Sequence, residues 1–153
     1  MGYTFTIGNA IPVHNKTGFP DLHASWEVEA AHDEHAPTFP NDELTSNGNS
    51  RSPSYTAWAD FCHTVGLYDF FYTLSGHLHA GHPGCIGITP HDAKFVSAAL
   101  SRYRGAVTLP PGFEGYRYQG PPRFDAHLAR LIWLEWWMRW AVEHCDTPAI
   151  ENT

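Results

Sequence analysis

Residues 127–145 read HLARLIWLEWWMRWAVEHC, and this stretch decides what kind of fold the chain can form. At about 100° per residue, its tryptophans gather in one sector of a helix, and an aliphatic sector lies almost opposite. A stripe of Glu135, Arg139 and Glu143 separates the two sectors at the spacing of helical ion pairs. A helix that is apolar on two faces must be covered on both. We therefore expect the central helix of the core, or a core helix that also forms an interface.

The bulk composition describes a single globular domain over residues 1–153. The chain has 153 residues, which is enough for one core and rarely enough for two, and its 42% hydrophobic and 16% charged residues are typical of a globular protein with few surface charges. The net charge of −7, without a basic cluster, argues against a nucleic-acid partner. The first residues show no signal-peptide pattern, and the longest apolar stretch is too short and too interrupted by charges to span a bilayer. Three cysteines at unrelated spacings are typical of reduced thiols, so we expect a cytoplasmic protein.

Two segments near the N-terminus alternate apolar and polar residues, as half-buried strands do. The first covers Tyr3–Ile7 and the second Ala24–Ala30, and the connection between them is rich in glycine and proline. We expect an antiparallel pair joined by a long loop. Residues 31–53 show no periodicity, and a loop of that length is usually functional or disordered.

Start and stop signals predict three to four helices in the rest of the chain. The predicted elements are a helix from Ser52 to Gly66 with Pro53 in its first turn, a short helix over Leu67–Leu74, turns over residues 75–88, a helix from Thr89 to about Arg104, a segment over Ala106–Leu109 that could add a strand, and the Trp-rich helix from Phe124 or Asp125. The expected fold class is α+β, a mostly helical body around the Trp-rich C-terminal helix with a small N-terminal antiparallel strand pair.

The first candidate site is the polar segment that leads into the first predicted helix. Unpaired backbone N–H groups and the helix dipole favour an anion there, and Arg51 could hold a phosphate or carboxylate through two parallel hydrogen bonds. The predicted ligand-binding residues are Asn47, Asn49, Ser50, Arg51, Ser52, Ser54 and Tyr55. In the alternative interpretation, Ser52 or Ser54 only caps the helix and the asparagines form turns.

A second candidate is a cluster of metal-ligand types within nine residues, namely His77, His79, His82 and Cys85. Imidazoles and thiolates bind zinc, but this spacing matches no zinc motif. His32, His35 or His63 could complete such a site. We predict no metal and no cofactor, with zinc as the alternative.

Metal-free catalysis has weaker support in the sequence. Cys62 or Cys85 beside a histidine could form a nucleophilic pair, and His91 with Asp92 could transfer protons. Cys62 lies on the apolar face of its helix, and Asp92 is explained by a helix cap. We therefore assign no catalytic residue and favour a protein that is not an enzyme.

The tryptophan sector can be core or surface. We expect Trp133 and Trp136 in the core, and we leave the outer part of the sector open as a patch for another chain or for a second copy in a homodimer. The predicted interface residues are Arg130, Trp137, Trp140 and His144.

The chain resembles small bacteriophage-encoded proteins of GC-rich, actinobacterial hosts. The resemblance is carried by Asn41-Asp42-Glu43, NGNSRSPSYTAW at 47–58, HPGC at 82–85 and LIWLEWWMRW at 131–140. It implies no activity, catalytic residue or cofactor, but phage accessory proteins of this size often act by binding.

These observations favour a non-enzymatic binding protein. It would be a phage accessory protein in the host cytoplasm, with a host protein or an anionic, nucleotide-like small molecule as its partner. One alternative is a zinc-dependent enzyme or zinc-stabilised domain that uses the His77–Cys85 cluster. The other is a structural protein that oligomerises through its tryptophan face.

Overall fold

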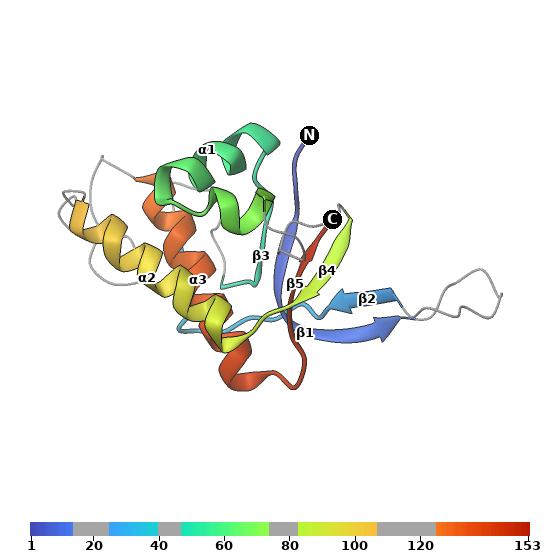
Figure 1. The fold of residues 1–153 in the computed structure, drawn as a ribbon. Helices are drawn as coiled ribbons and strands as arrows, with labels where there is room; N and C mark the ends of the chain where they lie inside the picture. The colour runs from blue at the N-terminus through green and yellow to red at the C-terminus, as the bar shows by residue number, and fades with distance from the viewer. Residues whose placement is uncertain (14–24, 40–46, 74–82, 107–124) are drawn as a thin grey trace.

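The computed structural model describes residues 1–13, 25–39, 47–73, 83–106 and 125–153. Within these ranges the helices gather on one side of a curled antiparallel sheet (Figure 1). The elements are β1 (Phe5–Val13), β2 (Ser25–Val28), β3 (Ser50–Arg51), α1 (Tyr55–Val65), the π-helical turn η1 (Asp69–Thr73), β4 (Gly84–Gly87), α2 (Pro90–Ala106), α3 (Ala126–His144) and β5 (Pro148–Asn152). The fold is mixed α+β, as the sequence predicts. The predicted strand at 106–109 falls almost entirely outside the described residues, and its first residue ends α2.

β1 is the centre of the sheet because it pairs with three other strands. Its first half lies between β3 and β5, and its second half pairs with β2. The strand order is β2-β1-β5-β4, with β3 beside β1, and each of these pairings is antiparallel. The end of the chain therefore supplies an inner strand, β5, which is hydrogen-bonded on both edges.

The predicted pair of N-terminal strands is present, but the first strand extends to Val13 and pairs with β2 through residues beyond the predicted Tyr3–Ile7. Residues 10–13 pair with residues 25–28, whereas residues 5–9 pair with β5. The sequence predicts neither β4, which falls in residues expected to form turns, nor β5. Both strands are short and contain glycine, proline, alanine or asparagine, which have low strand propensity. They form because neighbouring strands offer backbone partners, and this information is not local.

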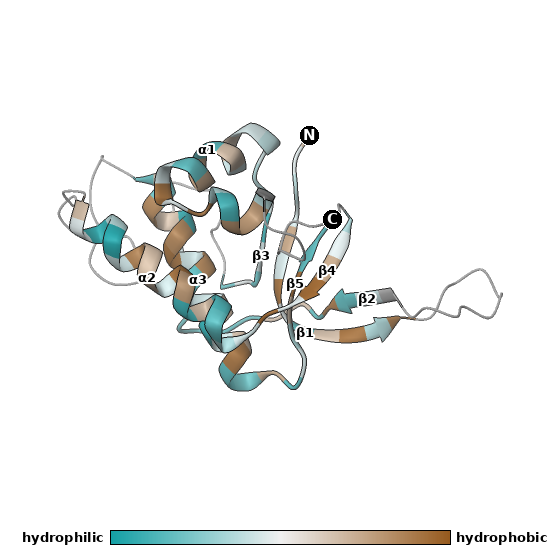
Figure 2. Cartoon of the chain, viewed as in Figure 1, coloured by the Kyte–Doolittle hydropathy of each residue, from teal (hydrophilic) through white to brown (hydrophobic). Residues whose placement is uncertain are grey.

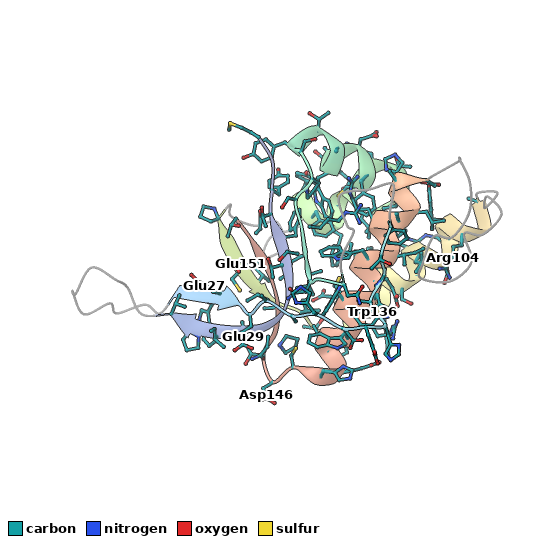
Figure 3. All side chains as sticks on the ribbon, turned by 180° about the vertical axis from the view of Figure 1, so that it is seen from behind. Glu27, Glu29, Arg104, Trp136, Asp146 and Glu151 are labelled. Carbon is teal, nitrogen blue, oxygen red and sulfur yellow. The ribbon has the colours of Figure 1, made fainter. Side chains whose placement is uncertain are left out.

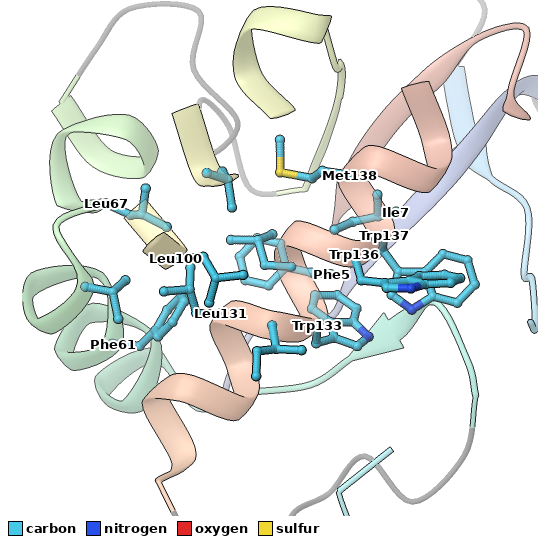
Figure 4. Close-up of a cluster of buried hydrophobic side chains, with 14 of the residues drawn as sticks. Phe5, Ile7, Phe61, Leu67, Leu100, Leu131, Trp133, Trp136, Trp137 and Met138 are labelled. Carbon is cyan, nitrogen blue, oxygen red and sulfur yellow. The ribbon is translucent and has the colours of Figure 1, made fainter. Parts of the chain in front are cut away.

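α3 is the central helix of the fold, as its two apolar sectors predict. Every residue from Leu128 to Met138 is buried. Leu67, Leu100 and Phe61 lie on one side of it, and Trp136 and Trp137 lie on the other (Figure 4). The hydropathy of the residues agrees with this central position. Hydrophobic residues lie along α3, and hydrophilic residues lie on β3 and on the outer turns of α2 (Figure 2).

The polar segment after β2 covers part of the tryptophan sector. Ala36 and Phe39 are buried in the main core, and the Trp133 indole N–H donates to the Gly48 carbonyl oxygen at 3.3 Å. Described residues of a segment without periodicity thus contribute to the core and contact Trp133 of α3. None of the described helices is long and apolar enough to cross a membrane.

Each long helix begins at a side-chain cap. The Ser54 hydroxyl accepts the Ala57 N–H at 3.1 Å, so α1 begins two residues later than the sequence predicts, and Pro53 precedes the cap. Gly66 ends α1 at a φ of 78°, a left-handed conformation that glycine adopts without strain. Thr89 and Asp92 cap α2 reciprocally at 2.9 and 3.1 Å, which confirms the predicted start of that helix. Asp125 caps α3 in the same manner at 3.0 Å.

Candidate functional site

The segment predicted to bind an anion folds as β3 followed by the cap of α1. Directly paired residues of an antiparallel ladder share a face, and Arg51 pairs with Phe5 of the core. Arg51 therefore points toward the helices and is only 2% exposed. Ser50 points the other way, and its hydroxyl oxygen lies 2.8 Å from that of Thr6. Because strand side chains alternate, the one cation of the segment does not face solvent.

Asn49 has a structural role in this fold. Its side-chain N–H groups donate to the carbonyl oxygens of Ile7 and Glu29, both at 2.9 Å, and its Oδ1 accepts the Ala31 N–H at 2.9 Å. The residue is 2% exposed. It joins β1 to the segments on either side, and both of its amide N–H groups are used. Burial thus argues against Asn49 and Arg51 as contacts for a ligand from solvent.

The rest of the predicted anion site lies at the N-terminus of α1. A polar hollow of about 310 Å³ is lined by residues 1–4 and by Ser52, Pro53 and Ser54. The Ser54 hydroxyl already caps the helix, and the Tyr55 ring packs edge-on against Tyr3 at 4.6 Å between centroids. Asn47 is half-buried, and its carbonyl oxygen accepts the Asp33 N–H at 3.2 Å. Ser52 is exposed, and its hydroxyl oxygen lies 3.1 Å from that of Thr4.

The predicted interface on the tryptophan face is mostly buried. Trp137 has no exposed surface, and Arg130 is 8% exposed with its guanidinium carbon 5.8 Å from the centre of the Phe61 ring. Trp140 is half-buried and His144 is exposed, and their rings stack at 5.4 Å. Trp137 and Arg130 therefore offer little surface to a partner, and the interface itself stays a prediction. The tertiary structure covers both faces of α3, as expected of a helix that is apolar on both.

The zinc alternative cannot be placed fully in the fold. His77, His79 and His82 lie outside the described residues, while Cys85 lies in β4. In the part of the chain that the structure describes, no three histidines, cysteines or acidic residues form a group that could hold a metal. The predicted absence of a metal thus stays a prediction.

Of the residues considered for catalysis, Cys62 lies in α1, Cys85 lies in β4, and His91 and Asp92 are adjacent in the first turn of α2. Cys62 is fully buried, and its burial raises the pKa of the thiol far above the usual value. Asp92 is committed to the cap of α2. A buried, protonated thiol is a poor nucleophile, so Cys62 belongs to the core, as its position on the apolar face predicts.

A different hollow lies on the side of the sheet away from the helices. It has a volume of about 370 Å³ and is lined by Trp26 and Glu27 of β2, Pro83, Gly84 and Cys85 at β4, and Glu151 and Thr153 at the end of the chain. β2 and β4 are the outer strands of the sheet, yet the curl of the sheet brings them close to each other. We call this space the β2–β4 hollow.

A side chain from β5 helps to hold the β2–β4 hollow in shape. Oε2 of Glu151 accepts the Val28 N–H at 3.0 Å, which ties β2 to β5 although the two strands do not pair. Beneath this bond Ala10, Val28 and Ala149 form a second, small core against which Cys85 packs. The floor of the hollow therefore consists of backbone and small buried side chains.

The walls of the β2–β4 hollow combine an aromatic ring with acidic groups. Trp26 is 46% exposed, unusually open for an indole. Burial and the nearby Glu151 carboxylate raise the pKa of the Cys85 thiol. The thiol therefore stays protonated at neutral pH and is a weak nucleophile. This set of groups is suited to binding.

Among the described residues, acidic side chains lie on both sides of the molecule, whereas the exposed lysine and arginine side chains lie on the helix side only. Glu27, Glu29, Asp146 and Glu151 lie on the sheet side, as Figure 3 shows. Glu29 and Asp146 contribute to a raised pKa of the Cys145 thiol, after burial as the main cause. Apart from the buried Arg51, the lysines and arginines that the structure describes all lie on α2 and α3. Among the residues that the structure describes, acidic side chains therefore predominate around the β2–β4 hollow.

Sequence reasoning did not identify this hollow. The alternating pattern of residues 24–30 places Trp26 on the apolar side of a half-buried strand. Nothing in that pattern indicates that the Trp26 indole stays exposed. The other walls come from β4 and β5, two strands that the sequence does not predict. No family model matches the chain, and neither a curated protein nor a solved structure matches it.

Proposed function

We propose that this protein is a non-enzymatic binding protein that recognises another protein through the β2–β4 hollow. The observation that carries the proposal is the exposed indole of Trp26 at the edge of a hollow of about 370 Å³. Tryptophan is the residue type most enriched where protein interfaces are strongest. A rigid hollow beside it can receive a side chain of the partner.

Binding fits this site better than catalysis does. Its thiol, Cys85, has a raised pKa, and the remaining ionisable groups of the lining are the carboxylates of Glu27 and Glu151. Nucleophilic catalysis needs an activated nucleophile beside a base, and the carboxylate here makes the thiolate less favourable. The partner is a host protein if the chain is phage-encoded, as the resemblance implies.

An anionic small molecule is the second candidate ligand, at the N-terminus of α1. The hollow of about 310 Å³ at Ser52 and Ser54 favours it, because the first turn of α1 carries no acidic residue that would repel an anion. The burial of Arg51 removes the cation expected to strengthen this site, so we rank it below the β2–β4 hollow.

The proposal can be tested by nuclear magnetic resonance of isotope-labelled protein. Extended basic, neutral and acidic peptides are titrated first, and ATP and inorganic phosphate separately. We expect at least one peptide class to shift the signals of Trp26, Cys85 and Glu151. Trp26→Leu should abolish the response, whereas Phe95→Leu, at an exposed aromatic residue of α2, should preserve it.

Two outcomes would overturn the proposal. If no peptide class affects the β2–β4 hollow, the hollow is not a protein-binding site. If only ATP or phosphate binds, with shifts confined to residues 52–55, the anion site at α1 becomes the better assignment.

A further inference from the structure

We infer that the β2–β4 hollow receives an arginine side chain from an extended basic segment of the partner protein. This inference rests on the proposed function, because it names the chemistry of the partner at the same site. Three observations support it: the side chains that line the hollow, the hydrogen bond that orients one of them, and the acidic residues around the hollow.

The walls offer the two contacts that suit a guanidinium group. Its flat face can stack on an indole, and Trp26 is 46% exposed beside the hollow. Its N–H groups can donate to carboxylates, and Glu27 and Glu151 both line the same space. A lysine ammonium is a compact point charge that cannot form the planar stack, so we expect arginine to be preferred.

One of the two carboxylates is already oriented. Oε2 of Glu151 accepts the Val28 N–H at 3.0 Å, and this bond fixes the plane of the carboxylate. Among the described residues, no hydrogen bond or ion pair engages the Glu27 carboxylate. A bound cation would therefore meet one preorganised acceptor and one acceptor that can adjust, which lowers the entropic cost of binding.

The surroundings favour a positively charged protein segment over an isolated small cation. Glu29 and Asp146 extend the negative region along the sheet side beyond the hollow (Figure 3). A basic segment with several charges can use this whole region, whereas a single small cation can use only the hollow. A hollow of about 370 Å³ has room for one long side chain, and Gly84 in its wall has no side chain to keep the partner backbone away.

The test uses blocked basic peptides of the form Gly-Lys-Thr-Xaa-Thr-Lys-Gly, in which Xaa is arginine, lysine, citrulline or leucine. Citrulline has nearly the shape of arginine without its charge, so it isolates the charge. We expect the arginine peptide to bind about tenfold more tightly than the citrulline peptide, with lysine between them, in titrations followed by resonance shifts. The preference should shrink as salt is added.

Matched protein variants test whether the carboxylates of Glu27 and Glu151 bind the arginine of the peptide. Glu151→Gln keeps an acceptor for the Val28 N–H, and Glu27→Gln changes an exposed side chain, so both variants should fold. Each should weaken binding of the arginine peptide by about five- to tenfold and reduce its preference over citrulline. Glu143→Gln, at an exposed carboxylate of α3, should leave both quantities unchanged. If Glu151→Gln lowers the thermal midpoint, its weaker binding could come from altered folding. The binding of the arginine peptide to Glu27→Gln then decides whether the inference holds.

The outcomes separate this inference from the proposed function. If arginine, citrulline and leucine peptides bind equally well at the hollow, or if both glutamine variants bind the arginine peptide as wild type does, the arginine assignment is wrong and the protein-binding role stands. If none of the peptides binds, neither holds.

Discussion

The two faces of β5 show how this molecule separates stability from recognition. Ile150 faces the helices, is buried, and belongs to the same core as the tryptophans of α3. Glu151, the next residue, points the other way and lines the β2–β4 hollow. The inner face is densely packed with aromatic and aliphatic side chains, while the outer face rests on a second core of small residues. Substitutions on the inner face should therefore change folding, and those on the outer face should change binding.

β3 repeats the same division over a shorter distance. Arg51 is buried on the inner face, whereas Ser50 and Ser52 lie exposed on the outer face. The three residues are neighbours in sequence and were predicted to act together on one ligand. Arg51 is buried on the inner face, so it does not share the exposed surface on which Ser50 and Ser52 lie.

The largest change in stability is expected for a substitution in the core on the inner, helix-facing side of the sheet. Trp133→Ala should lower the free energy of unfolding by about 3–5 kcal/mol, because a fully buried indole leaves a large cavity. Trp26→Ala, on the half-exposed indole of β2, should cost less than about 1 kcal/mol. Urea denaturation of both variants measures the difference. Equal losses would show that the two sides do not differ in packing.

Arg51→Ala should lower stability by an intermediate amount, and comparing it with Ser50→Ala separates the inner from the outer face of β3. Removing a buried arginine takes away packing as well as polar contacts, so we expect a loss of about 2 kcal/mol in unfolding free energy. Ser50→Ala, on the outer face, is the matched control and should cost less than about 0.5 kcal/mol. An Arg51→Ala protein with wild-type stability but impaired ligand binding would restore the anion site as first predicted from the sequence.

The smallest expected difference in stability is between substitutions of the two serines at the start of α1. Ser54→Ala removes the N-cap and should cost about 1 kcal/mol, whereas Ser52→Ala loses an exposed contact with Thr4 and should change stability little. Thermal melts of the two variants are sufficient, because the comparison needs only their difference. A larger loss for Ser52→Ala would place the start of the helix where the sequence pattern alone predicts it.

Helix-forming patterns were informative in this chain because their causes are local. The two apolar sectors of residues 127–145 correctly predict a helix that is covered on both faces. Thr89-Pro90-His91-Asp92 correctly predicts a capped start, since a cap involves residues three apart in sequence. Ser52 and Ser54 are both good N-cap residues, and the local sequence could not decide between them.

The candidate site was harder to predict because its residues meet only through long-range pairing. Trp26, Cys85 and Glu151 come from three strands, and β4 and β5 have too little intrinsic strand propensity to be recognised. The strand alternation near Trp26 indicated a strand, but it could not show that the outer face of that strand would stay open. The sequence did not indicate the burial of Asn49 and Arg51 for the same reason, because it does not show which strand lies beside them.

By itself, then, the sequence determined that α3 would be a central helix, that α2 would begin at a capping box, and that two strands near the N-terminus would pair. These features follow from side-chain periodicity and from hydrogen bonds between near neighbours. Only the tertiary structure decided that the end of the chain becomes an inner strand, that Arg51 is buried while Ser50 is exposed, and that the outer strands β2 and β4 curl toward each other around Glu151. Those outcomes depend on which distant backbone groups pair, and pairing across the chain is settled by the packing of the whole sheet against α3.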